Sequence, residues 1–205
     1  NKINVFINIM QISEINNQEI KKICSFLKKN KIKVIYLADS LGSLKPDSLV
    51  KIIKKFKKYW KGETGLHAHN NLNLALKNSI TATKNGFSWV DSTILGMGRG
   101  PGNLKTEDIL KVSNPKFISN INKLKNKYFN TLKKKYNWGP NKYYGFAAKN
   151  KIHPTYIQEM LSDRRYKDKN YNNILKNLKK SDARKYHPHK LFLSENIFIG
   201  KPEGN

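Results

Sequence analysis

The chain has 205 residues, of which 38% are hydrophobic, and a formal net charge of +26 at pH 7. This length accommodates one substantial domain with a buried core. No apolar run is long enough to cross a bilayer, so we expect no membrane association. The single cysteine, Cys24, excludes an internal disulfide and is typical of a reducing compartment, which predicts a cytoplasmic protein.

The chain opens on Asn1 and runs almost at once into an apolar stretch. A natural protein seldom begins inside a strand. We therefore expect the sequence to be the C-terminal part of a longer polypeptide.

Strands and helices alternate through the first 112 residues. Strands are expected at about 3–9, 34–38, 64–69 and 88–93, and helices at about 16–29, 46–60, 71–84 and from 106 onward. This alternation predicts a parallel sheet covered by helices. Four such units amount to about half of an eight-stranded β/α barrel.

Beyond about residue 114 the strands stop and helical patterns follow one another. Helices are expected at about 115–135, 140–150, 154–162 and 168–180. The predicted fold is thus α/β, a partial (β/α)8 barrel of about four C-terminal units followed by an all-helical region. We divide the chain into the barrel half at 1–112, the helical region at 113–183 and a tail without clear periodicity at 184–205.

Two histidines, His67 and His69, are spaced i, i+2 on the third predicted strand. Successive strand residues face opposite sides, so both imidazoles point the same way and can share one divalent metal. The pair lies where the strand ends and a helix follows, which is where parallel α/β folds build active sites. Alone, such a pair is also compatible with two ordinary polar residues.

Polar residues end the other predicted strands as well. The first strand carries Asn8, the second is followed by Asp39 and Ser40, and the fourth leads into a glycine-rich loop that ends on Asn103. The carboxyl ends of parallel strands meet at one edge of a sheet, so these side chains are predicted to converge. Packing alone does not explain polar residues at this one edge.

Three segments carry a resemblance to a known family. They are Ala38-Asp39-Ser40-Leu41-Gly42, Gly65-Leu66-His67-Ala68-His69-Asn70-Asn71-Leu72, and Gly96-Met97-Gly98-Arg99-Gly100-Pro101-Gly102-Asn103-Leu104-Lys105-Thr106-Glu107. In order and spacing they resemble the C-terminal half of the aldolase and acyl-CoA lyase/synthase superfamily of metal-dependent TIM barrels. Within it, the chain looks most like the 4-hydroxy-2-oxovalerate aldolase branch.

The resemblance implies roles for particular residues. It makes His67, His69 and Asn103 the candidate ligands of a divalent metal, Mn²⁺ or Mg²⁺. It places Asp39, Ser40 and Asn8 near the substrate. The family's aspartate ligand and its neighbouring catalytic arginine have no counterpart ahead of the histidines, so the catalytic residues are expected in an N-terminal half. The chain alone is therefore expected to be inactive.

The implied function is a metal-dependent aldolase that cleaves a 4-hydroxy-2-keto acid to pyruvate and an aldehyde. The loop at 96–103 lacks the reactive cysteine of HMG-CoA lyase, which disfavours that activity. A Claisen-type synthase that joins an acyl-CoA to a 2-keto acid, as in isopropylmalate synthase, remains an alternative. A keto acid is the expected ligand, and a homo-oligomer and a partner dehydrogenase are possible assemblies.

The strong basic charge suggests another class of function, a nucleic-acid-associated protein. The lysines are spread along the whole chain, as an AT-rich coding sequence would produce, and aromatic residues do not interleave with them as a base-stacking surface requires. We therefore expect nucleic acid not to be the partner.

Two further expectations concern histidines outside these segments. His153, before Pro154, is predicted to cap the following helix, and His187-Pro188-His189 is a weak metal candidate because proline disrupts a strand.

Overall fold

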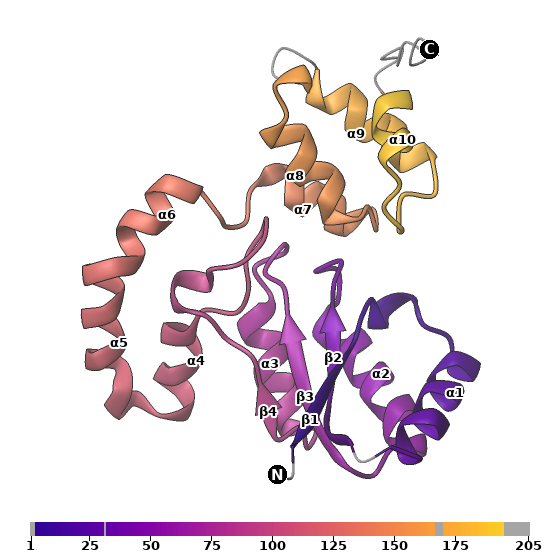
Figure 1. The fold of residues 1–205 in the computed structure, drawn as a ribbon, viewed down its shortest axis with the longest axis vertical. Coiled ribbons are helices and arrows are strands. Elements are labelled where there is room, and N and C mark those ends of the chain that lie inside the picture. The colour runs from indigo at the N-terminus through magenta and orange to yellow at the C-terminus, as the bar shows by residue number, and fades with distance from the viewer. Residues whose placement is uncertain (1–2, 31, 167–169, 195–205) are drawn as a thin grey trace.

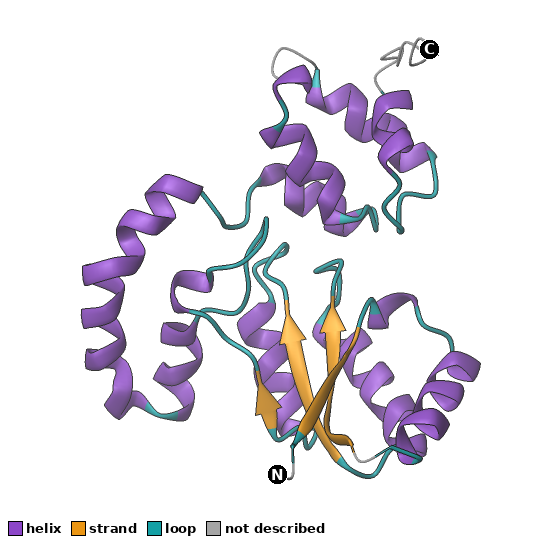
Figure 2. Cartoon of the chain, in the orientation of Figure 1, coloured by secondary structure: helices purple, strands orange, loops and turns teal. Residues whose placement is uncertain are grey.

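The structure is a computed structural model that describes residues 3–30, 32–166 and 170–194. Its N-terminal part is a parallel sheet in the order β1-β2-β3-β4. The strands are β1 (Val5–Ile9), β2 (Ile32–Asp39), β3 (Glu63–Ala68) and β4 (Trp89–Val90). Helices α1 (Asn17–Lys28), α2 (Pro46–Tyr59) and α3 (Ala75–Lys84) connect them and cover one face (Figures 1 and 2). This confirms the α/β fold of a partial (β/α)8 barrel.

The sheet presents two different faces because side chains alternate along each strand. One face packs against the helices, where Ile35, Leu37 and Leu66 contact a fully buried layer that includes Ile53 and Phe56 of α2. The opposite face carries the residues that would line a barrel interior. The strand alternation read from the sequence therefore fixes which side chains can form a site.

Two elements are shorter than predicted. β4 consists only of Trp89–Val90, because Thr93 pairs through its backbone with Leu104 and Thr106 of the loop beyond the strand. Helix α3 starts at Ala75 rather than near 71. Asn70 accepts a hydrogen bond from the Ala75 amide with its side-chain oxygen (3.2 Å), and the segment between them forms a turn.

Beyond the glycine-rich loop, the secondary structure of the described chain is helical. The elements are α4 (Thr106–Ser113), α5 (Ile118–Leu124), a π-helical turn at Lys125–Phe129, α6 (Asn130–Tyr136), α7 (Lys142–Lys149), α8 (Pro154–Ser162), α9 (Tyr171–Lys180) and α10 (Pro188–Leu193). Helices α7 to α10 enclose a second core, which includes the fully buried Tyr156, Ile174 and Leu178. Figure 1 shows them above the carboxyl ends of the strands. No helix among the described residues has the length and apolarity to cross a membrane.

One expectation for the C-terminal end was wrong. Helix α10 forms inside the stretch from 184 onward that showed no periodicity, and Pro188 occupies its first turn, where a proline is well tolerated. His187 is the residue that precedes the helix, so His187 and His189 do not share a strand face. Residues 195–205 of the predicted tail lie outside the described residues.

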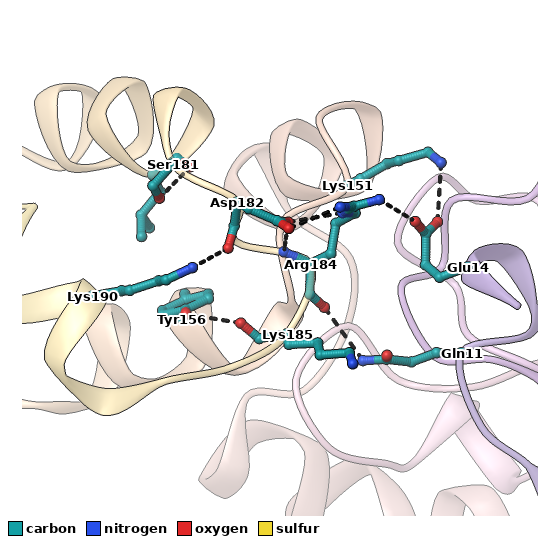
Figure 3. Close-up of polar contacts among 10 residues, drawn as sticks. Gln11, Glu14, Lys151, Tyr156, Ser181, Asp182, Arg184, Lys185 and Lys190 are labelled. Carbon is teal, nitrogen blue, oxygen red and sulfur yellow. Dashed lines mark hydrogen bonds and ion pairs between the residues drawn. The ribbon is translucent and has the colours of Figure 1, made fainter.

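The helical region is attached to the barrel half by polar contacts. Gln11, which follows β1, donates from its side-chain amide to the Arg184 carbonyl (3.3 Å). The carboxylate of Glu14 pairs with Lys151 (3.0 Å) and Arg184 (3.5 Å), as Figure 3 shows. These contacts hold the helical region over the end of the sheet where the predicted site residues gather.

Candidate metal centre

His67 and His69 lie side by side at the carboxyl end of β3, as their spacing predicts. Their Nε2 atoms are 3.3 Å apart, and the two rings meet edge to face with an interplanar angle of 76°. Neither ring is fully exposed. The two nitrogens therefore face each other across a narrow gap.

The other ring nitrogens determine which atoms carry the lone pairs. His67 Nδ1 is 3.0 Å from a carboxylate oxygen of Asp91, and His69 Nδ1 is 3.2 Å from the Ser40 carbonyl oxygen. These oxygens only accept hydrogen bonds, so both Nδ1 atoms donate. In the neutral rings, both lone pairs are then on the Nε2 atoms that face each other.

His69 is held in its neutral form. Burial lowers its pKa to about 4, the charges of His67 and His153 act in the same direction, and the hydrogen bond to Ser40 partly opposes them. A metal ligand must present a free lone pair, so His69 does not need to release a proton at neutral pH before it binds.

The gap between the histidines fits one metal ion. Two nitrogens that each lie about 2.1 Å from a common metal, at octahedral or tetrahedral angles, are separated by about 3.0 to 3.4 Å. The observed separation is 3.3 Å. Among the described residues, no group of three or more His, Cys, Asp or Glu side chains is placed to hold a metal. The chain thus offers two nitrogen donors and leaves room for oxygen ligands.

Asn103 lies beside this pair. Its backbone forms a β-bridge with His69, and its side-chain nitrogen donates to the Met97 carbonyl (3.3 Å), which leaves the amide oxygen available. Gly98 makes room for this side chain, since a Cβ at that position would lie 2.6 Å from the Asn103 Nδ2 atom. The glycine loop therefore shapes the position of the amide.

The predicted substrate residues divide into two groups. Ser40 is buried, accepts a hydrogen bond from the Gln11 amide (2.9 Å) and orients His69 through its carbonyl. Asn8 is exposed on β1 and stands opposite Tyr36 in the sheet register. Both belong to the interior face of the sheet.

Asp39 has a different position from the one expected. It is buried, and its two carboxylate oxygens accept hydrogen bonds from the amides of Ser43 and Leu44, each at 3.1 Å. Strand alternation puts it on the helix-covered face, opposite to Ser40. The side chain fixes the turn that leads to α2, so we leave it out of the candidate site.

A cavity of about 250 Å³ adjoins the histidines at the junction with the helical region. Its walls include Ser40 and His69 from the barrel half and His153 and Thr155 from the start of α8. Arg99 of the glycine loop reaches α8 and donates to the side chains of Gln158 (2.6 Å) and Thr155 (3.3 Å). Helix α8 thus forms part of the wall.

His153 caps α8, as predicted, because its Nδ1 accepts a hydrogen bond from the Thr155 amide (3.3 Å). Burial and the charge of Arg99 lower its pKa. No sequence pattern predicts that His153 lines the same cavity as His69, because the two residues belong to separate elements. Asp91 is a further residue that the sequence analysis did not select. Alternation along the fourth predicted strand places it on the interior face, so a signal for it was present.

Comparison with known proteins agrees with this architecture. Two curated relatives, both named 4-hydroxy-2-oxovalerate aldolase, come from Brevibacillus brevis and Geobacillus genomosp. 3. The first is 39% identical over 79 residues, which are 38% of this chain and 23% of the relative. The second is 30% identical over 104 residues, 51% of this chain and 31% of the relative. The matches therefore span less than a third of the relatives' own lengths.

Solved structures extend the likeness to the helical region. The N-terminal domain of a candidate aldolase from Bacteroides vulgatus superposes with a TM-score of 0.67 at 29% identity, covering 83% of this chain and 56% of that one. The carboxyl transferase domain of Rhizobium etli pyruvate carboxylase superposes with a TM-score of 0.69 over 95% of this chain and 37% of that one. At 13% identity, this second likeness concerns the fold alone.

The family whose model matches is described as HMGL-like, and the match covers residues 2–123. This range includes all four strands and the histidine pair, and it makes up more than half of the chain. The chain belongs to the HMGL-like family.

Proposed function

We propose that this chain forms the metal-binding half of a divalent-metal-dependent aldolase that cleaves a 4-hydroxy-2-keto acid to pyruvate and an aldehyde. The observation that carries the proposal is the pair of facing Nε2 atoms of His67 and His69, 3.3 Å apart, with both Nδ1 atoms engaged elsewhere. Two lone pairs directed at one gap repel each other until a cation lies between them.

The proposed ligands are His67, His69 and the amide oxygen of Asn103, and the proposed metal is Mn²⁺ or Mg²⁺. The amide oxygen and added water or substrate oxygens suit both ions, whereas imidazole nitrogens are ligands of transition metals, so the donor set favours Mn²⁺ of the two. When bound, the ion supplies electrophilic stabilisation of the negative charge that develops on the keto acid during carbon–carbon cleavage.

The chain's own residues then orient the ligand. Ser40 lies beside His69, and Asn8 lies on the same interior face of the sheet, on β1, where it pairs with Tyr36. We propose that both residues contact the keto acid. The cavity next to His69 gives the remainder of the substrate a place against Arg99 and α8. We assign the general base to none of these residues and propose that it comes from an N-terminal half of the barrel.

The relatives support the choice of reaction, because several carry the name 4-hydroxy-2-oxovalerate aldolase. The relatives match this chain over only part of their length, so the same activity is proposed for this chain. A cytoplasmic location, a homo-oligomer and a partner dehydrogenase belong to the same proposal.

Proton exchange at the methyl group of pyruvate in D₂O tests the function without an aldehyde. The chain is assayed alone and as a chimera behind the residues that precede the matched segment in the Brevibacillus brevis aldolase. We expect exchange by the chimera with Mn²⁺, none after EDTA treatment, and none by the chain alone. His67→Ala and His69→Ala should each lower the exchange rate and Mn²⁺ affinity at least about tenfold. His189→Ala, an exposed histidine outside the site, is the control.

Three outcomes would overturn parts of this proposal. An unchanged rate of proton exchange in both histidine variants would contradict the assignment of His67 and His69 as metal ligands. Exchange that survives EDTA would remove metal dependence. If exchange is absent while the chimera releases free CoA from acetyl-CoA and a keto acid, the Claisen-type synthase replaces the aldolase.

A further inference from the structure

We propose that Asp91 is a positioning residue that keeps the histidine pair open for the metal, by holding the ring proton of His67 on Nδ1. This inference rests on the proposed function, because it concerns the same metal site. The role of Asp91 follows from its contacts with the neighbouring strand β3.

The backbone places Asp91 beside His67. Asp91 directly follows β4, and its amide donates to the Leu66 carbonyl of β3 (3.1 Å), which continues the pairing of these two strands by one residue. Its carboxylate then reaches His67 Nδ1 at 3.0 Å. The His67 side chain is 25% exposed and that of Asp91 is 40% exposed, so the contact is partly shielded from water.

A second residue contacts the same carboxylate. Tyr36 of β2 is buried, and its pKa is raised to about 12, first by burial and then by the neighbouring charge and hydrogen bonding of Asp91. Its ring lies against Gly65, where a Cβ would come within 2.5 Å of the ring. A carboxylate can accept several hydrogen bonds, so Tyr36 and His67 can hold Asp91 together.

The consequence lies in what the histidines would do without Asp91. His69 donates from Nδ1 to Ser40, so its Nε2 can only accept while the ring is neutral. A neutral His67 that loses its Nδ1 acceptor can move its proton to Nε2 and donate across the 3.3 Å gap to His69. This hydrogen bond would occupy the space that the metal needs.

Asp91 therefore favours the tautomer of His67 whose Nε2 lone pair is free. Outer partners of metal-bound histidines commonly act in this way, and their loss costs about 10- to 100-fold in metal affinity. The distinguishing feature here is a competing bond between the two ligands themselves.

The test uses ¹⁵N-labelled, metal-free chain at a pH well above the ordinary histidine pKa. Nitrogen chemical shifts report which ring nitrogen of His67 carries the proton. We expect Nδ1–H in the wild type and a shift toward Nε2–H in Asp91→Ala. Asp91→Glu, which restores an acceptor, should recover Nδ1–H in part. Asp108→Ala is the control, because Asp108 is a carboxylate on α4 whose side-chain exposure of 35% is close to that of Asp91 and which pairs with Lys111.

Metal affinity is then measured from the broadening of the His67 and His69 resonances by Mn²⁺. We expect Asp91→Ala to weaken binding about 10- to 100-fold and Asp108→Ala to leave it unchanged. An unchanged tautomer in Asp91→Ala, or an affinity equal to that of the control, would overturn the role of Asp91 while the metal site stands. If Mn²⁺ does not broaden either histidine in the wild type, the proposed metal site itself fails, and the role of Asp91 with it.

Discussion

The carboxylate of Glu14 and the guanidinium of Arg184 join the two ends of this chain at 3.5 Å. Glu14 follows β1 and is only 13% exposed on its side chain, whereas Arg184 lies between α9 and α10 in the helical region. Lys151 adds a second cation to the same carboxylate at 3.0 Å. The pairing joins the helical region to the segment that follows β1, and Figure 3 shows Lys151 and Arg184 both directed at Glu14.

Replacing Glu14 with Gln should loosen this junction. The variant keeps the shape of the side chain and removes the charge that holds both cations. We expect amide hydrogen exchange of residues 183–187 to accelerate about two- to fivefold, as loss of partly exposed ion pairs does. Mass spectrometry of peptides measures it, with Asp108→Asn as a control that breaks a surface pair elsewhere. Unchanged exchange would show that other contacts fix the junction.

The pH dependence of stability should carry a signature of Asp39. Burial raises its pKa from 3.8 to about 6, although hydrogen bonds from Leu44, Ser43 and Gly42 oppose the shift. The folded state then binds more protons than the unfolded state between these values. The contribution of Asp39 is fully present below pH 3.8 and is lost as pH rises through about 6.

Asp39→Asn removes this titration and tests it. The free energy of unfolding of the wild type relative to the variant should decrease as pH rises from about 4 to about 7, the reverse of an ordinary paired carboxylate. Urea denaturation at several pH values measures this difference. A difference that grows with pH would mean that the turn amides lower the pKa of Asp39 more than burial raises it.

Gly98→Ala should disturb the proposed metal site through Asn103. The added Cβ would lie 2.6 Å from the Asn103 side-chain nitrogen, so the amide must move. We expect Mn²⁺ affinity to fall by about tenfold. Gly145→Ala in α7 is the matched control, because the nearest atom to its Cβ is 3.8 Å away. Equal affinity in the two variants would exclude Asn103 as a ligand.

The half barrel should associate in solution. Strands β1 and β4 each pair with one neighbour only among the described residues, and Phe6 and Trp89 of the interior face remain 45% and 39% exposed. An unpaired strand at the edge of a sheet can form backbone hydrogen bonds with a strand of another chain. The net charge of +26 opposes this at low salt, so added salt should promote it.

Light scattering after size exclusion, over a range of chain and salt concentrations, measures the association. Val5→Lys, which places a charge on the β1 edge, should reduce it, and thermal unfolding of the wild type should be broad and occur at low temperature. A monodisperse monomer with a sharp cooperative transition would contradict the expectation.

Features that depend on local geometry could be predicted from the amino-acid sequence. Alternating strand and helix patterns predicted the parallel half barrel. The i, i+2 spacing placed His67 and His69 on one face, because side-chain direction along a strand follows from the backbone alone. Two helix starts were equally predictable, since Pro46 is the first residue of α2 and His153 caps α8 by accepting a hydrogen bond from the amide two residues further on.

Features that depend on contacts between elements could be seen only in the three-dimensional structure. Asp91 contacts His67 because β4 pairs with β3. The side chain of Asp39 accepts hydrogen bonds from two backbone amides of the turn that follows it, so it faces away from the histidines. Helix α8 brings His153 to the cavity beside His69 because a second core, formed far along the chain, holds it there. Such distances depend on how whole elements pack, and periodicity along the sequence does not encode them.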